Sequence, residues 1–132
     1  MISHIHNTAI IVSDQERALE FYVGTLGWEK RIDYAMGDGY RFVTVAPVGG
    51  ATELALNTEQ MMGNPAGTGI ANSPGMDGAS GITLAVENFD ETYRMLVERG
   101  VKFTREPEST PWGDKATWLS DPDGNTFFFV GR

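Results

Sequence analysis

The stretch VSDQERALEFYV at residues 12–23 shares its pattern with VENFDETYRMLV at residues 86–97, 74 positions later. Each stretch leaves a strand-like run and continues with apolar residues at the three- and four-residue spacing of an amphipathic helix. After one deletion, LGWEKR at 26–31 aligns with RGVKFT at 99–104, and a glycine ends each helix. Neither copy can bury its apolar face alone, so the sequence predicts two tandem supersecondary units.

The two helices are also predicted to start in the same way. Ser13 stands at the expected N-cap of the first helix, with Glu16 three positions later, and Asn88 and Glu91 repeat this arrangement. In such a capping box the two side chains satisfy backbone amides that the helix leaves unbonded. The repeat therefore extends to the chemistry of the helix starts.

Strand-like runs precede and follow the helices, separated by turn residues. In the first half they cover residues 5–12, 29–34, 40–47 and 52–57, with turns at Asp38-Gly39 and Gly49-Gly50. In the second half they cover residues 101–105, 116–120 and 126–130, with DPDGN at 121–125 as the last turn. Each half is predicted to be a βαβββ module of an α+β fold.

The length of 132 residues suits one domain, which buries roughly two-thirds of its unfolded surface. We expect a single domain over residues 1–132, with module one at about 4–57, a linker at about 58–79 and module two at about 80–132. Glycine and proline exclude a regular element from most of the linker. It is either a solvated connection or a flap that carries Met61 and Met62 over a pocket.

Charge and composition exclude several classes of partner. The net charge of −8 opposes binding to nucleic acid. The absence of cysteine excludes disulfides, thiolate metal sites and cysteine nucleophiles. No export signal or membrane-spanning stretch is visible, so we expect a cytoplasmic protein without membrane contact.

The paired modules, with Phe21-Tyr22 and Leu26-Gly27-Trp28 at the first helix and DPDGN at 121–125, resemble the vicinal oxygen chelate superfamily. This superfamily contains glyoxalases, extradiol dioxygenases and bleomycin-resistance proteins. The resemblance implies a cup-shaped, eight-stranded mixed sheet around a cavity for a small-molecule ligand. It also implies a homodimer.

The same resemblance indicates where a metal would bind in metal-dependent relatives. The four positions fall, by motif, on Asn7, Glu53, Gly81 and Phe128. Glycine and phenylalanine offer no side-chain donor, whereas a divalent ion needs four or more nitrogen or oxygen ligands. We therefore expect no metal ligands and no cofactor, with a divalent metal at Glu53 kept as the alternative. His4 and His6 are interpreted as structural or solvated.

Glu53 is the one acid retained among these positions. It is the candidate catalytic residue, as a pocket carboxylate for proton transfer or for pairing with a ligand cation. The alternatives are an ordinary half-exposed strand glutamate, or a glutamate that pairs with Arg41 across the sheet. Trp112 and Trp118 are candidate ligand contacts, because aromatic side chains stack on planar or cationic ligands. The predicted ligand-binding set is Asn7, Arg41, Glu53, Trp112, Trp118 and Phe128.

Three functions remain open from the sequence. The first is a binding module that holds a small organic ligand in the cup between the modules without a catalytic metal. The second is a metal-dependent lyase, isomerase or dioxygenase that uses Glu53 with non-standard ligands. The third is a dimeric scaffold whose cavity is filled by its own side chains. Whether the protein is an enzyme is therefore undecided by the sequence.

Overall fold

The computed structural model describes residues 1–37, 39–61 and 79–132. The chain divides into two compact units, Met1–Ser73 and Pro74–Arg132. The predicted turn residue Asp38 and the predicted flap residue Met62 lie outside the described residues. No helix in the described part of the chain is long and apolar enough to cross a membrane.

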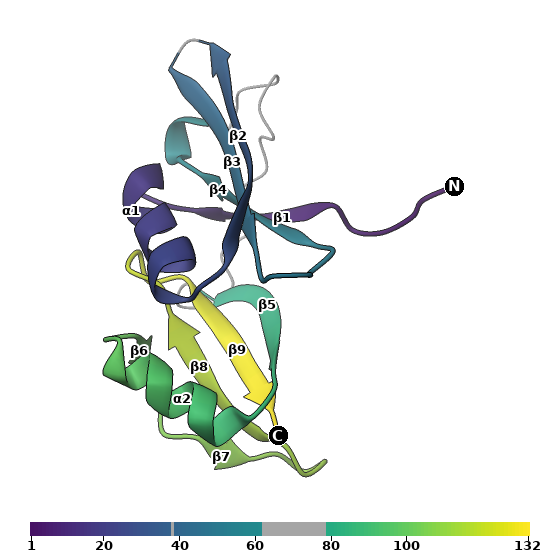
Figure 1. Ribbon diagram of the computed structural model, residues 1–132, viewed down its shortest axis with the longest axis vertical. Coiled ribbons are helices and arrows are strands. Elements are labelled where there is room, and N and C mark those ends of the chain that lie inside the picture. Colours follow the sequence, from purple (N-terminus) through teal and green to yellow (C-terminus); the bar gives the residue numbers. More distant parts are fainter. Residues whose placement is uncertain (38, 62–78) are drawn as a thin grey trace. The chain divides into compact units, whose positions relative to one another are not determined.

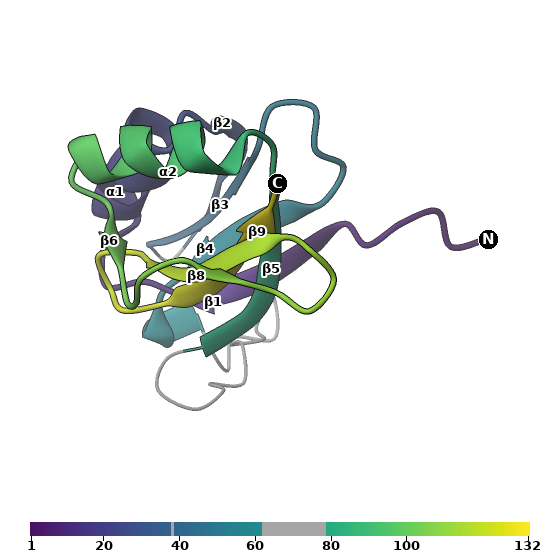
Figure 2. The same ribbon diagram turned by 90° about the horizontal axis from the view of Figure 1, so that it is seen from below.

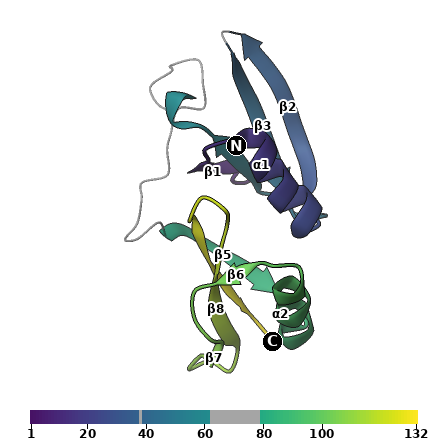
Figure 3. The same cartoon turned by 90° about the vertical axis from the view of Figure 1, so that its left-hand side faces the viewer.

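The first unit contains a four-stranded sheet and the first repeat helix (Figure 1). Its strands run in the order β1-β4-β3-β2, with β1 parallel to β4 and the other pairs antiparallel. Figure 3 shows α1 along one face of this sheet. The elements are β1 (Asn7–Ile11), α1 (Gln15–Leu19), η1 (Glu20–Thr25), β2 (Glu29–Gly37), β3 (Tyr40–Ala46), β4 (Glu53–Asn57) and η2 (Glu59–Met61).

The second unit repeats this plan with one additional short strand. Its sheet has the order β5-β9-β8-β6, and β7 pairs with β8. β5 is parallel to β9, and β8 is antiparallel to β9, β6 and β7. The elements are β5 (Ala79–Val86), α2 (Phe89–Glu98), β6 (Lys102–Phe103), β7 (Glu108–Ser109), β8 (Lys115–Ser120) and β9 (Thr126–Gly131).

The predicted α+β fold of two tandem modules with mixed sheets is confirmed. The described residues form two hydrogen-bonded sheets of four and five strands, rather than one continuous eight-stranded sheet. Sequence reasoning missed β7, because its two residues, Glu108 and Ser109, are both exposed and give no apolar alternation.

The first helix is capped one residue later than predicted. Oδ1 of Asp14, not the hydroxyl of Ser13, accepts from the amides of Glu16 at 2.8 Å and Arg17 at 3.2 Å. Aspartate is as good an N-cap as serine, so adjacent candidates cannot be separated by residue type. Asn88 occupies the predicted N-cap of α2, but at φ 51° its side chain makes no capping bond.

The last turn of the first helix contains one residue more than the last turn of the second. α1 continues into η1, a π-helix, where the amide of Leu26 donates to the carbonyl of Phe21, five residues earlier, at 2.9 Å. The amide of Trp28 then donates to the carbonyl of Tyr22 at 2.9 Å. A π-turn closes over one residue more than an α-turn.

α2 makes the equivalent closing bonds without the additional residue. The amide of Arg99 donates to the carbonyl of Met95, four residues earlier, at 3.1 Å. The amide of Val101 donates to the carbonyl of Leu96 at 3.0 Å. In the repeat these pairs align with Leu26 and Phe21, and with Trp28 and Tyr22. The deletion needed to align the two sequences is therefore the residue that η1 accommodates.

In the second unit, α2 packs on one face of the sheet and leaves the opposite face without a helix. Figure 2 shows α2 over one face of the sheet. The ring of Phe89 in α2 lies 5.4 Å from that of Phe129 in β9, measured between centroids. Successive strand side chains alternate between faces, so Phe128 lies on the opposite, helix-free face. Trp118 pairs with Phe128 across the strands and shares that face.

Candidate functional site

Asn7 and Glu53 lie side by side in the first unit. Asn7 of β1 pairs in register with Glu53 of β4. Oε1 of Glu53 accepts a hydrogen bond of 2.8 Å from the hydroxyl of Thr44, which is fully buried. The same hydroxyl accepts from the amide of Ile32 at 3.1 Å. The carboxylate is therefore tied to β3 and, through Thr44, to β2.

Arg31, rather than Arg41, is the cation beside Glu53. Nη1 of Arg31 lies 3.8 Å from Oε2 of Glu53. The guanidinium is fixed by Oε1 of Glu29 at 2.6 Å and by the carbonyl of Gly50 at 2.8 Å. The predicted pairing of Glu53 with Arg41 is wrong. Arg31 occupies a register shift in β2 between Lys30 and Ile32, and strand alternation does not reveal such a shift.

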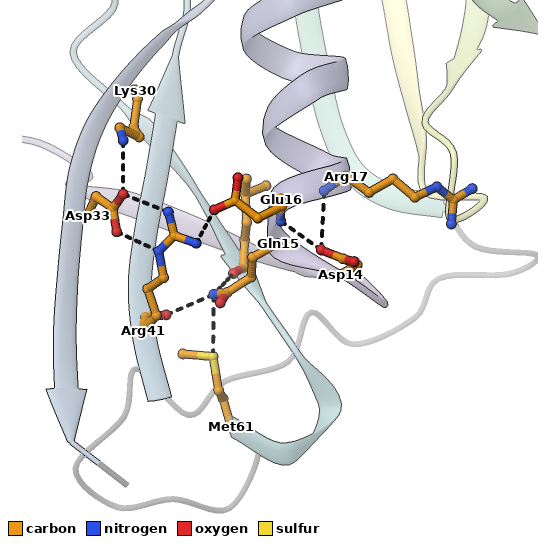
Figure 4. Close-up of polar contacts among 9 residues, drawn as sticks. Asp14, Gln15, Glu16, Arg17, Lys30, Asp33, Arg41 and Met61 are labelled. Carbon is orange, nitrogen blue, oxygen red and sulfur yellow. Dashed lines mark hydrogen bonds and ion pairs between the residues drawn. The ribbon is translucent and has the colours of Figure 1, made fainter. Parts of the chain in front are cut away.

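Arg41 belongs to a separate ion-pair network between α1 and β2 (Figure 4). Its Nε and Nη2 donate to the two carboxylate oxygens of Asp33 at 2.6 and 2.7 Å, and Nη1 pairs with Glu16. Nζ of Lys30 also donates to Asp33, at 2.9 Å. Next to this network, Nε2 of Gln15 donates to the carbonyl of Arg41 at 2.8 Å. A ligand-binding role for Arg41 stays a prediction.

This network lowers the pKa of Asp33 well below its ordinary value, first through the hydrogen bonds from Arg41 and then through the one from Lys30. A carboxylate with a depressed folded pKa stabilises the protein above its unfolded pKa, about 3.9, and this contribution is lost as the pH falls through the folded value. The hydrogen bonds that Arg41 donates to Asp33 likewise raise the pKa of Arg41, which is charged at every working pH.

Asp33→Asn is expected to lower the free energy of unfolding by up to about 1 kcal/mol at pH 7, the range of partly exposed pairs. The deficit should shrink as the pH falls below roughly 4, because Asp33 of the unfolded wild-type chain then binds a proton that it must release on folding. Urea unfolding of both proteins at pH 7, 5, 4 and 3 measures the difference in the free energy of unfolding between Asp33→Asn and the wild type. In an Arg41→Met background the same substitution should have much less effect. A deficit that grows on acidification would contradict the assignment.

Trp118 and Phe128 form an aromatic pair on the helix-free face of the second sheet. Their ring centroids are 5.1 Å apart, and both side chains are half-buried. Thr83 of β5 pairs with Phe128, whereas Gly81 lies within a register shift of β5 at φ 76°. The structure therefore brings together two of the three predicted residues of this unit.

Trp112 lies in the turn before β8 and its side chain is 59% exposed. Its Nε1 donates to Oδ2 of Asp114 at 2.8 Å. The turn is closed by the amide of Thr110, which donates to the carbonyl of Asp114 at 2.7 Å. The indole is thus held in place while remaining accessible, and its ligand role stays a prediction.

The residues at the family's metal positions do not fit a divalent ion. Oε1 of Glu53 is bonded to Thr44, and Oε2 faces the cation of Arg31. Gly81 has no side chain, and Phe128 packs against Trp118. Within the described ranges, no group of three or more histidine, aspartate and glutamate side chains could hold a metal. His4 and His6 are both exposed, as the solvated interpretation expects.

The chain belongs to the glyoxalase/bleomycin resistance protein/dioxygenase superfamily, whose family model matches residues 4–129. A superfamily member from Sphaerobacter thermophilus DSM 20745 has a crystal structure that is 47% identical, with a TM-score of 0.85 over 99% of this chain and 98% of that one.

Two further similar proteins carry different functional descriptions. TnmS3, an antibiotic binding protein from Streptomyces sp. CB03234, is 35% identical with a TM-score of 0.76, covering 98% of this chain and 96% of that one. The uncharacterised protein YetH of Bacillus subtilis (strain 168) is 31% identical over 96% of this chain and 97% of its own length.

Proposed function

We propose that this protein binds a small, partly apolar organic molecule without using a catalytic metal. The observation that carries the proposal is the state of Glu53, whose carboxylate is bonded to Thr44 and faces Arg31. A carboxylate held in this way is poorly suited to ligate a cation, because the guanidinium already supplies positive charge beside it. It remains suited to orient a polar ligand group.

Aromatic surface supports the same function. Trp118 and Phe128 leave the helix-free face of the second sheet partly accessible, and aromatic rings of this kind line many small-ligand sites. The antibiotic-binding description of TnmS3 makes an antibiotic or a compound of similar size the first ligand class to test. We propose Asn7, Glu53, Trp118 and Phe128 as ligand contacts.

The proposal includes a homodimer in the cytoplasm, as the family resemblance and the absence of cysteine suggest. Size-exclusion chromatography with light scattering tests the dimer directly, and a mass of one chain at micromolar concentration would remove that part of the proposal. The other parts do not depend on it.

Elemental analysis of tag-free protein separates this function from that of a metal-dependent enzyme. We expect less than about 0.1 equivalent of zinc, nickel, iron or manganese per chain, because the donor set is incomplete. One equivalent that is lost in Glu53→Gln would instead support a metal-dependent lyase, isomerase or dioxygenase.

Trp118→Leu is expected to weaken binding of an apolar antibiotic by about tenfold or more, because stacking on the indole is lost. Calorimetric titration of the wild type and the variant with a panel of apolar antibiotics measures the change in the dissociation constant. Trp28→Leu is the matched control, since Trp28 packs against Tyr22 in the first unit with centroids 5.4 Å apart. Equal losses in both variants, or no binding to the wild type across the panel, would count against the proposed function.

A further inference from the structure

The guanidinium of Arg31 and the carboxylate of Glu53 face each other without a direct hydrogen bond. Nη1 of Arg31 and Oε2 of Glu53 are 3.8 Å apart, beyond the 2.7–3.2 Å typical of N–H···O bonds. Among the residues that the structure describes, no other protein group hydrogen-bonds to either of these two atoms. One N–H donor and one acceptor oxygen are thus presented side by side.

The remaining bonds of these two side chains hold them in place. Nε and Nη2 of Arg31 are engaged by Glu29, Gly50 and the carbonyl of Pro47, the last at 3.3 Å. Oε1 of Glu53 is engaged by Thr44. The side chains of Arg31 and Glu53 are still 23% and 14% exposed. The donor and the acceptor are therefore pre-positioned and reachable, which lowers the entropic cost of binding.

The spacing and charges favour a ligand oxygen that can both accept and donate a hydrogen bond. An oxygen about 2.8 Å from both atoms can bridge 3.8 Å only if it accepts from Arg31 and donates to Glu53. A carbonyl or ether accepts but does not donate. A carboxylate is repelled by Glu53, and an ammonium is repelled by Arg31. A hydroxyl meets both requirements.

We propose that Arg31 and Glu53 form a recognition site for a hydroxyl group, alcoholic or phenolic, on the ligand. Glu53 then distinguishes a hydroxyl from an ether or a carbonyl, as a hydrogen-bond acceptor rather than as a catalytic base, and Arg31 supplies the matching donor. This inference rests on the proposed ligand-binding function and names the polar group that the ligand carries.

A pair of naphthalene probes tests the site. 2-Naphthol carries the hydroxyl, and 2-methoxynaphthalene has the same ring system with an ether that cannot donate. We expect wild-type protein to bind 2-naphthol at least about tenfold more tightly, because hydrogen bonds to charged groups are the stronger kind. Fluorescence titration of each probe gives the two dissociation constants.

Arg31→Met should weaken binding of both probes by several-fold, because the oxygen of each probe accepts from Nη1 of Arg31, and it should leave part of the preference for 2-naphthol. Glu53→Gln, which is nearly isosteric, should reduce the preference by several-fold, and Arg105→Met, an exposed arginine of the second unit, should leave it unchanged. Circular dichroism of every variant checks folding. If the Arg31→Met variant does not fold, the Glu53→Gln variant alone tests the hydroxyl site.

The outcomes separate the two proposals. Equal wild-type affinity for both probes, an unchanged preference in Glu53→Gln, or unchanged affinity for both probes in Arg31→Met would overturn the hydroxyl site and leave the proposed function standing. Binding of neither probe would overturn the hydroxyl site. The antibiotic panel then decides the proposed function separately.

Discussion

Replacing Phe129 with alanine is expected to lower the free energy of unfolding by about 3–5 kcal/mol, the range for a phenylalanine removed from a core. Phe129 is only 3% exposed, and its ring lies 5.4 Å from that of Phe89 and 5.3 Å from that of Phe103. The substitution would empty the space between α2 and the second sheet. Urea unfolding followed by circular dichroism measures the loss.

Phe128→Ala provides the matched control, because the same substitution is made one residue away on the helix-free face. Its side chain is half-buried, so we expect a loss of about 1–2 kcal/mol. Under the proposed function this variant should weaken ligand binding, whereas Phe129→Ala acts through stability. Equal destabilisation by both variants would contradict the assignment of the two faces.

Thr44→Val is the second substitution with a large expected effect, about 2–4 kcal/mol in the free energy of unfolding. Valine has nearly the shape of threonine but removes the hydroxyl that donates to Glu53 and accepts from the amide of Ile32. Each buried group left without a partner costs about 1–3 kcal/mol. Because Thr44 is fully buried, water cannot replace the lost bonds without rearrangement.

Two control variants identify the hydroxyl as the cause. Thr44→Ser keeps the hydroxyl and should recover most of the stability. Thr8→Val, at an exposed position of β1, should change it by less than about 0.5 kcal/mol. A loss in Thr44→Ser as large as in Thr44→Val would assign the effect to packing instead.

The fold could be predicted from the sequence because its signals are repeated. The helix stripe, the terminating glycine and the strand alternation occur once in each half, so each half supports the interpretation of the other. The N-cap at Asp14 and the short strand β7 could not be fixed, because neighbouring polar residues compete for caps and two-residue strands carry no period.

The candidate site was only partly predictable. Asn7 and Glu53 meet because β1 and β4 pair in register, as the resemblance implied. The predicted pairing of Glu53 with Arg41 was wrong because of strand geometry. Thr44 pairs with Ala55 and shares the face of Glu53, whereas Arg41 is an odd number of residues from Thr44 and so takes the other face. Arg31 reaches Glu53 only because the β2 register shifts, which sequence alternation cannot indicate.

Because of the π-turn in η1, equivalent residues of the two modules are separated by two different spacings, and this matters when a residue is copied from one module to the other. Strand pairing matches Ile10 with Leu56 and Leu84 with Phe129, so residues correspond at a spacing of 74 before the turn and 73 after it. A slip of one residue along a strand exchanges its faces. On this spacing Glu53 corresponds to Thr126, and Phe128 corresponds to Ala55. An acid grafted into the second module as a copy of Glu53 therefore belongs at Thr126.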